Sequence, residues 1–204
     1  MERKRGPTTF LKQSYPMRPK FPLFQSHLDL AHDLWKKVVL PGDTVIDATC
    51  GNGHDTVVLA QMIGEGTLYA IDIQKEALEN TKQKLQKEYL PYVRWIHGCH
   101  SEFPKEITSA KLIVYNLGYL PGSSKEITTQ RETTLKSIQN SLEILQEGGC
   151  ISITCYPGHP EGAKEEECIL AFASTLDPKI WSSCHHRWIN RKNAPSLLWI
   201  QKFI

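Results

Sequence analysis

The sequence has no long hydrophobic run, no paired cysteine motif and no large excess of charge of one sign. No stretch of about 20 apolar residues occurs, so a membrane-spanning helix is not expected, nor is a secretory signal. The six cysteines form no C-x-x-C pair, which favours reduced thiols and a cytoplasmic protein over a disulfide framework. The formal net charge of only +2 excludes a strongly basic or acidic protein.

An excess of positive charge lies at the N-terminus. Residues 1–20 carry six Lys and Arg residues against one Glu, with three prolines. This composition is typical of a solvated tail, and it also suits an arm that contacts nucleic-acid phosphates. We therefore expect a flexible basic extension over residues 1–24. A single domain should follow over residues 25–204, because that length suits one sizeable core and is short for two.

Strand-like and helix-like segments alternate through this domain. The expected strands span residues 44–48, 67–73, 92–98, 111–117, 150–156, 179–189 and 196–204. The expected helices span residues 26–39, 54–63, 74–89, 133–146 and 161–176, the fourth stopping at Gly148 and Gly149. The last two strands have no helix between them and should form an antiparallel hairpin. The pattern predicts an α/β protein with a doubly wound, seven-stranded, mostly parallel sheet.

A glycine turn, D-A-T-C-G-N-G-H-D-T at residues 47–56, follows the first expected strand. The third glycine of a dinucleotide fingerprint is missing, because Thr56 occupies its position. Asp47 would repel a phosphate and hold a cation, and Asp72 is placed to accept hydrogen bonds from ribose hydroxyls. A ligand with an ammonium group, a ribose and no phosphate fits this pattern, namely S-adenosylmethionine. The alternative is a structural turn that binds NAD or no ligand.

Two further motifs, N-L-G-Y-L-P-G and Y-P-G-H-P-E-G, start at Asn116 and Tyr156, at the ends of the fourth and fifth expected strands. Asn116 offers a side-chain carbonyl to an amine, and Tyr119 offers an aromatic face to a flat base. Tyr156 and His159 should face the same crevice, because the carboxyl ends of parallel strands meet at one edge. The plainer alternatives are an ordinary turn with an exposed tyrosine and a structural histidine.

Other histidines and cysteines suggest chemistry that the spacing does not support. The segments H-G-C-H (residues 97–100) and C-H-H (residues 184–186) lack the usual spacing of zinc ligands, so no metal is expected. Methyl transfer from a sulfonium needs positioning more than covalent catalysis, so a nucleophilic role for Cys99 or Cys155 is disfavoured.

Seven segments together resemble one family: DATCGNGHDT, AIDIQKEAL, CHSEF, NLGYLPG, ITT, YPGHPEG and INRKNAP. From about residue 26 to residue 204, the chain resembles the bacterial and plant methyltransferases once described as ribosomal-RNA methylases. These are now understood as tRNA 5-aminomethyl-2-thiouridine methyltransferases. The resemblance implies the Rossmann-like class I methyltransferase fold. It also implies methylation of the aminomethyl nitrogen on wobble uridine 34, giving 5-methylaminomethyl-2-thiouridine.

The resemblance also implies roles for individual residues. The cofactor would be bound by Asp47, Thr49, Gly51, Asn52, Gly53, His54, Asp55, Asp72, Ile73, Gln74, His100, Asn116, Leu117 and Gly118. The substrate would be bound by Tyr119, Leu120, Pro121, Gly122, Tyr156, His159, Asn190 and Asn193. Asn116, Tyr119 and His159 would be catalytic. The implied partner is the tRNA anticodon stem-loop, with no membrane partner and with a homodimer left open.

Two other functions stay open at this point. The chain could methylate another RNA, such as ribosomal RNA, or a base amino group. It could also be a non-catalytic module that binds a nucleotide or RNA with the same fold. The intact set of Asp47, Gly51, Gly53 and Asp72 argues against loss of cofactor binding.

Overall fold

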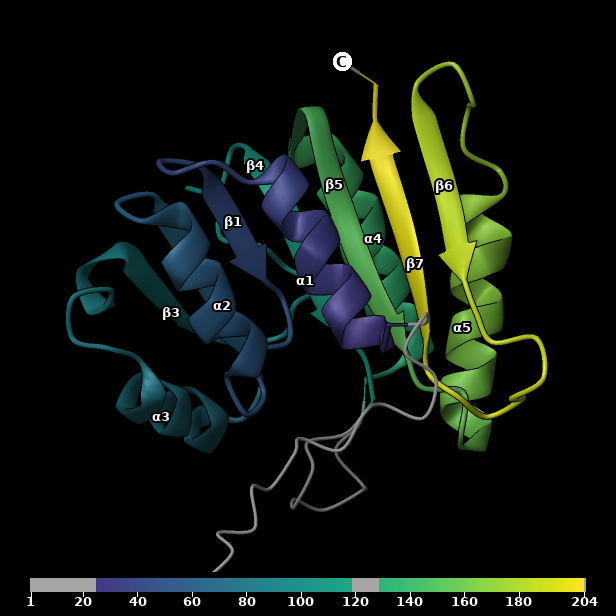
Figure 1. The fold of residues 1–204 in the computed structure, drawn as a ribbon, viewed down its shortest axis with the longest axis horizontal. Coiled ribbons are helices and arrows are strands. Elements are labelled where there is room, and N and C mark those ends of the chain that lie inside the picture. Colours follow the sequence, from purple (N-terminus) through teal and green to yellow (C-terminus); the bar gives the residue numbers. More distant parts are fainter. Residues whose placement is uncertain (1–24, 119–128, 204) are drawn as a thin grey trace, which may run out of the picture.

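A computed structural model describes residues 25–118 and 129–203 of the chain (Figure 1). The strands are β1 (Thr44–Asp47), β2 (Thr67–Asp72), β3 (Val93–His97), β4 (Ala110–Asn116), β5 (Leu145–Cys155), β6 (Trp181–His186) and β7 (Ser196–Lys202). The helices are α1 (His27–Val38), α2 (His54–Ile63), α3 (Lys75–Lys84), α4 (Arg131–Ile144) and α5 (Pro160–Ala173), with a 3₁₀ turn at Leu90–Tyr92. The expected extension, residues 1–24, lies outside the described residues, as do residues 119–122 of the fourth-strand motif.

The sheet has the predicted topology. Seven strands pair in the order β3-β2-β1-β4-β5-β7-β6, and β1 to β5 are parallel. The expected C-terminal hairpin is confirmed, because β6 and β7 pair antiparallel and β7 also pairs antiparallel with β5. The strand order reverses between β1 and β4. Their carboxyl ends therefore flank the crevice where doubly wound sheets bind ligands.

The sheet is covered on both faces, as the apolar strands require. Successive side chains of a strand point to opposite faces, so Val45 and Ile46 belong to different core clusters. Helices α1, α2 and α3 pack on one face, and α4 and α5 pack on the other. Figure 1 shows α1 crossing in front of β5, with α4 behind the sheet. No helix within the described ranges is long and apolar enough to cross a membrane.

Several element boundaries differ from the prediction, and packing explains two of them. The third helix ends at Lys84 because Leu85 leaves the helical conformation and is buried in the core. The fourth helix ends at Ile144 and not at the glycine pair, which lies within β5. There the pairing with β4 shifts register, and a Cβ on Gly149 would lie 2.8 Å from the Gln146 carbonyl oxygen. The glycines serve an irregular, crowded strand and not a helix end.

Candidate active site

A cavity of about 1070 Å³ opens at the carboxyl ends of the parallel strands, on both sides of the β1–β4 crevice. Its position is the one expected for a ligand of a doubly wound sheet. Most of the residues predicted to bind cofactor or substrate line it: Thr49, Gly51, Asn52, Gly53, His54, Asp55, Asp72, Ile73, Gln74, His100, Asn116, Leu117, Gly118, Tyr156, His159 and Asn193. The structure brings these residues together from six segments of the chain.

Among the described residues, two predicted site residues do not line this cavity. Asp47 is fully buried, and Asn190 is exposed on the β6–β7 connection. Tyr119, Leu120, Pro121 and Gly122 lie outside the described residues. The expected direct contact between Asp47 and a ligand is therefore corrected, because the carboxylate lies beneath the turn that would hold the ligand.

The buried Asp47 explains the missing third glycine. The Thr56 hydroxyl donates a hydrogen bond of 2.6 Å to the Asp47 carboxylate, and the Thr49 amide donates a second one of 3.3 Å. Burial, and then the charge of Asp55, raises the pKa of Asp47 to about 7. A glycine at position 56 would leave this buried carboxyl group without its shortest hydrogen bond. Thr56 therefore holds the buried carboxyl group beneath the turn, and the position is not shaped for a bound pyrophosphate.

The turn itself is fixed by Asp72 at the end of β2. One carboxylate oxygen accepts the Gly51 amide at 2.7 Å, and the other accepts the Gln74 amide at 2.8 Å. Burial raises the pKa of Asp72, and these two backbone hydrogen bonds oppose the shift. Each carboxylate oxygen has a second lone pair, so Asp72 can still accept from ribose hydroxyls while it holds the turn.

The second glycine of the turn is needed for packing. Gly53 has a φ of 77°, and a Cβ there would lie 2.4 Å from the Thr81 side chain on α3. Thr81 also donates a hydrogen bond of 3.3 Å to the Gly51 carbonyl oxygen. The close contact between the turn and α3 thus requires glycine. Burial raises the pKa of the neighbouring Cys50 to about 12, which makes its thiol a poor nucleophile.

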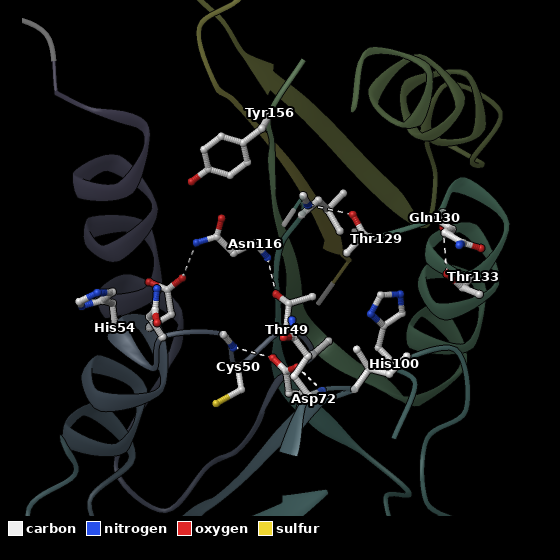
Figure 2. A pocket seen from close by; sticks show the side chains of 18 of the residues that line it. Thr49, Cys50, His54, Asp72, His100, Asn116, Thr129, Gln130, Thr133 and Tyr156 are labelled. Carbon is white, nitrogen blue, oxygen red and sulfur yellow. Dashed lines mark hydrogen bonds between the residues drawn. The ribbon is translucent and has the colours of Figure 1, made fainter. Parts of the chain in front are cut away.

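His100 provides a test of whether the cavity fits S-adenosylmethionine. Burial lowers the pKa of His100 to about 4, so the ring is neutral, and a hydrogen bond to the Ala48 backbone opposes the shift. Its Nε2 atom is buried and has no partner among the described residues. If Nδ1 carries the proton toward Ala48, Nε2 is an acceptor for an amino group such as that of adenine. Figure 2 shows His54 and His100 on opposite sides of the cavity, with Thr49 and Asp72 between them.

These residues fit the cofactor. An acceptor for an adenine amino group and a carboxylate for ribose hydroxyls lie in one cavity with the acidic Asp55. Neighbouring acids suit the cationic methionine part of the ligand.

Asn116 lies at the end of β4 and lines the cavity between Thr49 and Tyr156 (Figure 2). Its backbone amide donates to the Thr49 hydroxyl at 2.6 Å, which ties the end of β4 to the glycine turn. Its side-chain nitrogen donates to the Asp55 carboxylate at 3.1 Å. Because a carboxylate only accepts, this contact orients the amide and leaves the Asn116 carbonyl oxygen as an acceptor for a ligand.

Helix α1 contributes two histidines that the sequence analysis did not predict. His32 Nε2 lies 2.8 Å from the Asp55 carboxylate. His27 Nε2 lies 3.4 Å from the Tyr156 hydroxyl, and the Tyr156 ring lies beside Asn116 in Figure 2. Burial, and then the charge of Asp55, raises the pKa of Tyr156 to about 12, so the hydroxyl stays protonated at neutral pH. No spacing in the sequence indicated these contacts, because they join segments far apart in the chain.

Thr129 and Glu165 are a second group that residue-level reasoning missed. The Thr129 hydroxyl accepts from the Gly118 amide at 2.8 Å and donates to Glu165 at 2.8 Å. Thr134 donates to the other oxygen of this buried carboxylate at 2.6 Å. Burial raises the pKa of Glu165, and the two threonine hydrogen bonds oppose the shift. The I-T-T motif, which ends at Thr129, was the one sequence signal for this group.

His159 lines the cavity and also begins α5. Its Nδ1 atom accepts the Gly162 amide at 3.1 Å, so this nitrogen caps the helix. A Cβ on Gly162 would lie 2.2 Å from the Tyr156 carbonyl oxygen, which explains the last glycine of the Y-P-G-H-P-E-G motif. Within residues 25–118 and 129–203, no three His, Cys, Asp or Glu side chains converge as metal ligands would.

One family model matches about two thirds of this chain. That model, described as "Putative rRNA methylase", matches residues 68–202. A relative from Arabidopsis thaliana, the chloroplastic tRNA (mnm(5)s(2)U34)-methyltransferase, is 37% identical over 210 residues. The match covers 93% of this chain and 77% of the relative. Because the match to the Arabidopsis relative covers 93% of this chain, it includes both the glycine turn and the ends of β4 and β5.

Two solved structures are similar over most of the fold. One, described as a "putative rRNA-methylase" from Clostridium thermocellum, has a TM-score of 0.85 and 38% identity. The other, described as a "putative methyltransferase" from Streptococcus mutans in complex with SAH, has a TM-score of 0.80 and 34% identity. Each comparison covers 88% of this chain and 99% of the other chain.

Proposed function

The chain belongs to the family described as "Putative rRNA methylase", and we propose that it methylates the aminomethyl nitrogen of 5-aminomethyl-2-thiouridine at wobble position 34 of tRNA. It is an S-adenosylmethionine-dependent methyltransferase of class I fold. The proposed product is 5-methylaminomethyl-2-thiouridine. The name of the Arabidopsis relative supports this nucleoside. The observation that carries the proposal is the oriented amide of Asn116, whose carbonyl oxygen suits an amine acceptor.

The chemistry asks the protein mainly for positioning and for a neutral amine. When bound, S-adenosylmethionine supplies a methyl group already activated on a sulfonium. An alkyl amine is largely protonated near pH 7, and burial in the cavity beside a positive charge lowers its pKa. The Asn116 carbonyl oxygen then accepts an N–H of the amine, which directs the nitrogen lone pair at the methyl carbon. The nitrogen–carbon bond forms as the carbon–sulfur bond breaks, and the electron pair remains on sulfur.

The proposed cofactor assignments are those that the family resemblance implies, and they are supported by the residues that line the cavity. Asp72 and Gln74 would hold the ribose, and His100 would contact the adenine. The residues of the glycine turn and the start of α2 would surround the methionine part, namely Thr49, Gly51, Asn52, Gly53, His54 and Asp55. Asp47 acts from beneath the turn, by accepting from Thr49 and Thr56.

The substrate assignments rest on the residues around Asn116. Tyr156 lies beside Asn116, Asn193 lines the same cavity, and both would contact the nucleoside. His159 would contact a phosphate or base, in addition to capping α5. For Tyr119 the proposal rests on the family motif alone, because that residue lies outside the described part of the chain.

The proposed partner is the anticodon stem-loop, because the target uridine lies in it. We further propose a cytoplasmic protein, since all six cysteines are free thiols. Formation of a homodimer is left to measurement of the mass in solution.

A second candidate function is methylation of ribosomal RNA. The descriptions of the family model and of the Clostridium thermocellum structure favour it. The two candidates differ in the acceptor atom and in the RNA that carries it, so one experiment separates them.

That experiment is methyl transfer by the purified protein to tRNA that carries 5-aminomethyl-2-thiouridine, followed by mass analysis of the nucleosides. We expect a gain of one methyl group on this nucleoside alone. Matched tRNA without the aminomethyl group, and ribosomal RNA, are the controls. Methylation of ribosomal RNA but not of the modified tRNA would overturn the proposal and establish the second candidate.

A further inference from the structure

Three side chains from three elements form a continuous hydrogen-bonded chain that ends at the proposed reaction centre. His32 of α1 contacts one oxygen of Asp55 on α2 at 2.8 Å. The other oxygen of Asp55 accepts from the Asn116 side-chain nitrogen at the end of β4, at 3.1 Å. The side chain of Asp55 is 10% exposed and that of His32 is 24% exposed. The chain therefore runs from the half-buried face of α1 into the cavity.

The orientation of an asparagine amide depends on its neighbours. Rotation by half a turn would exchange the oxygen and the nitrogen, which have nearly the same shape and opposite hydrogen-bonding roles. Asp55 removes this ambiguity, because a carboxylate can accept from the nitrogen and would repel the oxygen. Asp55 thus favours the orientation that presents the Asn116 carbonyl oxygen to a ligand, and the Tyr156 hydroxyl contacts the same side chain through a second hydrogen bond.

The Asp55 carboxylate, in turn, needs a partner on its other oxygen. A carboxylate bonded on one side only can rotate about its terminal side-chain bond, since that rotation has a broad profile. The ring of His32 prevents this by occupying the second oxygen, and the ring is itself packed against Trp35, with ring centroids 4.6 Å apart. The histidine is therefore held by the core while it holds the acid.

We propose that His32 is a positioning residue for methyl transfer, which acts through Asp55 to keep the Asn116 carbonyl oxygen directed at the incoming amine. The inference rests on the proposed function for its kinetic consequence, but the orientation of the amide does not depend on the identity of the substrate. His32 exchanges no proton with the substrate in this assignment. Its contribution is the hydrogen bond that it makes to Asp55.

The kinetic test compares His32→Ala with His32→Gln under single-turnover conditions, with S-adenosylmethionine and tRNA both saturating. Loss of a hydrogen bond to a charged group is expected to slow His32→Ala by about 10-fold or more. His32→Gln should regain most of the rate, because the glutamine amide can donate to Asp55 from nearly the same place. The affinity for S-adenosylmethionine should stay within about threefold of wild type in both variants.

The matched control is His185→Ala. His185 also faces a glutamate, Glu166, at 3.6 Å, and both side chains are 19% exposed, but neither residue lines the cavity. This variant should lose thermal stability without losing the single-turnover rate. If His32→Ala does not fold, His32→Asn replaces it, because the shorter amide cannot reach Asp55.

The second readout is independent of activity. The side-chain NH₂ signals of Asn116, identified by their loss in Asn116→Ala, report its hydrogen bond to Asp55 in a nuclear magnetic resonance spectrum. These signals should move toward the values of a solvated amide in His32→Ala and stay in place in His32→Gln and His185→Ala. If wild type fails to methylate the tRNA, the proposed function fails, while these signals still test the positioning role.

Two results would overturn the inference. One is a His32→Ala protein that keeps both the wild-type rate and the wild-type Asn116 amide signals. The other is a folded His32→Gln protein as slow as His32→Ala, which would mean that ring packing against Trp35, and not the hydrogen bond to Asp55, is what matters.

Discussion

The two sides of the cavity are built in different ways. The cofactor half, formed by residues 48–53 and 72–74, is held by hydrogen bonds from backbone amides to a carboxylate, such as that from Gly51 to Asp72. The acceptor half, formed by Asn116, Tyr156 and the side chains that hold them, depends on contacts between side chains of distant elements, such as that from Asn116 to Asp55. Backbone contacts fix the place of a ligand, and side-chain contacts fix which atom faces it. We therefore expect substitutions in the two halves to change different steps.

The largest effect is expected in the acceptor half. Asn116→Ala removes the acceptor that orients the amine, so transition-state stabilisation should fall by about 2–4 kcal/mol with little change in the affinity for cofactor or tRNA. The measurement is the single-turnover methylation rate with both ligands saturating. Raising the pH should rescue little of the loss, because orientation is lost as well as a proton acceptor.

Asn140→Ala is the matched control for this variant. Asn140 is a residue of α4 whose side chain donates a hydrogen bond of 3.0 Å to the Ser101 carbonyl oxygen. It does not line the cavity. Its removal should leave the methylation rate near wild type. A near-wild-type rate for Asn116→Ala as well would contradict the assignment of the acceptor half.

The next largest effect is expected in the cofactor half. Asp72→Ala should weaken S-adenosylmethionine binding by about 1.5–3 kcal/mol, because it removes the ribose acceptor and frees the amides of the turn. Titration calorimetry measures this directly. Asp43→Ala, which removes a carboxylate that accepts the Leu40 amide at the opposite end of β1, is the control and should bind normally. Undiminished affinity in a folded Asp72→Ala protein would remove Asp72 from the site.

A smaller effect concerns the acid beneath the turn and its dependence on pH. Asp47 has a pKa of about 7 in the fold and about 3.9 in an unfolded chain, so between these values the folded state holds a proton that the unfolded state has released. Its contribution to stability is thus present below about pH 4 and is lost as the pH rises through about 7.

Asp47→Asn tests this linkage. Denaturant unfolding at pH 4.5, 6 and 8 should show the variant gaining stability relative to wild type as the pH rises. A difference between the two proteins that is the same at all three pH values would mean that Asp47 ionises normally in the fold.

The smallest effect is expected outside both halves. Removal of residues 1–20 should weaken tRNA binding by about tenfold or less and flatten its dependence on salt, because phosphate contacts release counterions. Cofactor affinity should not change. An unchanged salt dependence would show that the basic extension is only a solvated tail.

The fold was predictable because its signal is repeated along the chain. Each strand and helix shows its own hydrophobic period, and the absence of a helical pattern between the last two strands was enough to predict the hairpin. The boundaries failed where packing overrides local preference. Leu85 ends α3 by turning into the core, and Gly149 allows close backbone contact within β5.

The parts of the site that depend on short sequence motifs were predictable, and those that depend on contacts between distant segments were not. The turn at Gly51 and the acid at Asp72 follow from strand ends that meet at one edge. The depth of Asp47 could not be read from the sequence, because alternation along a strand gives the face of the sheet and not the distance from a ligand. His32 was also beyond prediction, since nothing in α1 shows that its N-terminal half lies beside α2 and the end of β4.

The most direct test of the central claim is the wobble nucleoside of tRNA from cells that lack this protein. We predict that such cells accumulate 5-aminomethyl-2-thiouridine and lack its methylated form. Wild-type protein should restore the methylated form, and Asn116→Ala protein should not. An unchanged wobble nucleoside in the deletion strain, with a methyl group missing from ribosomal RNA instead, would contradict the account.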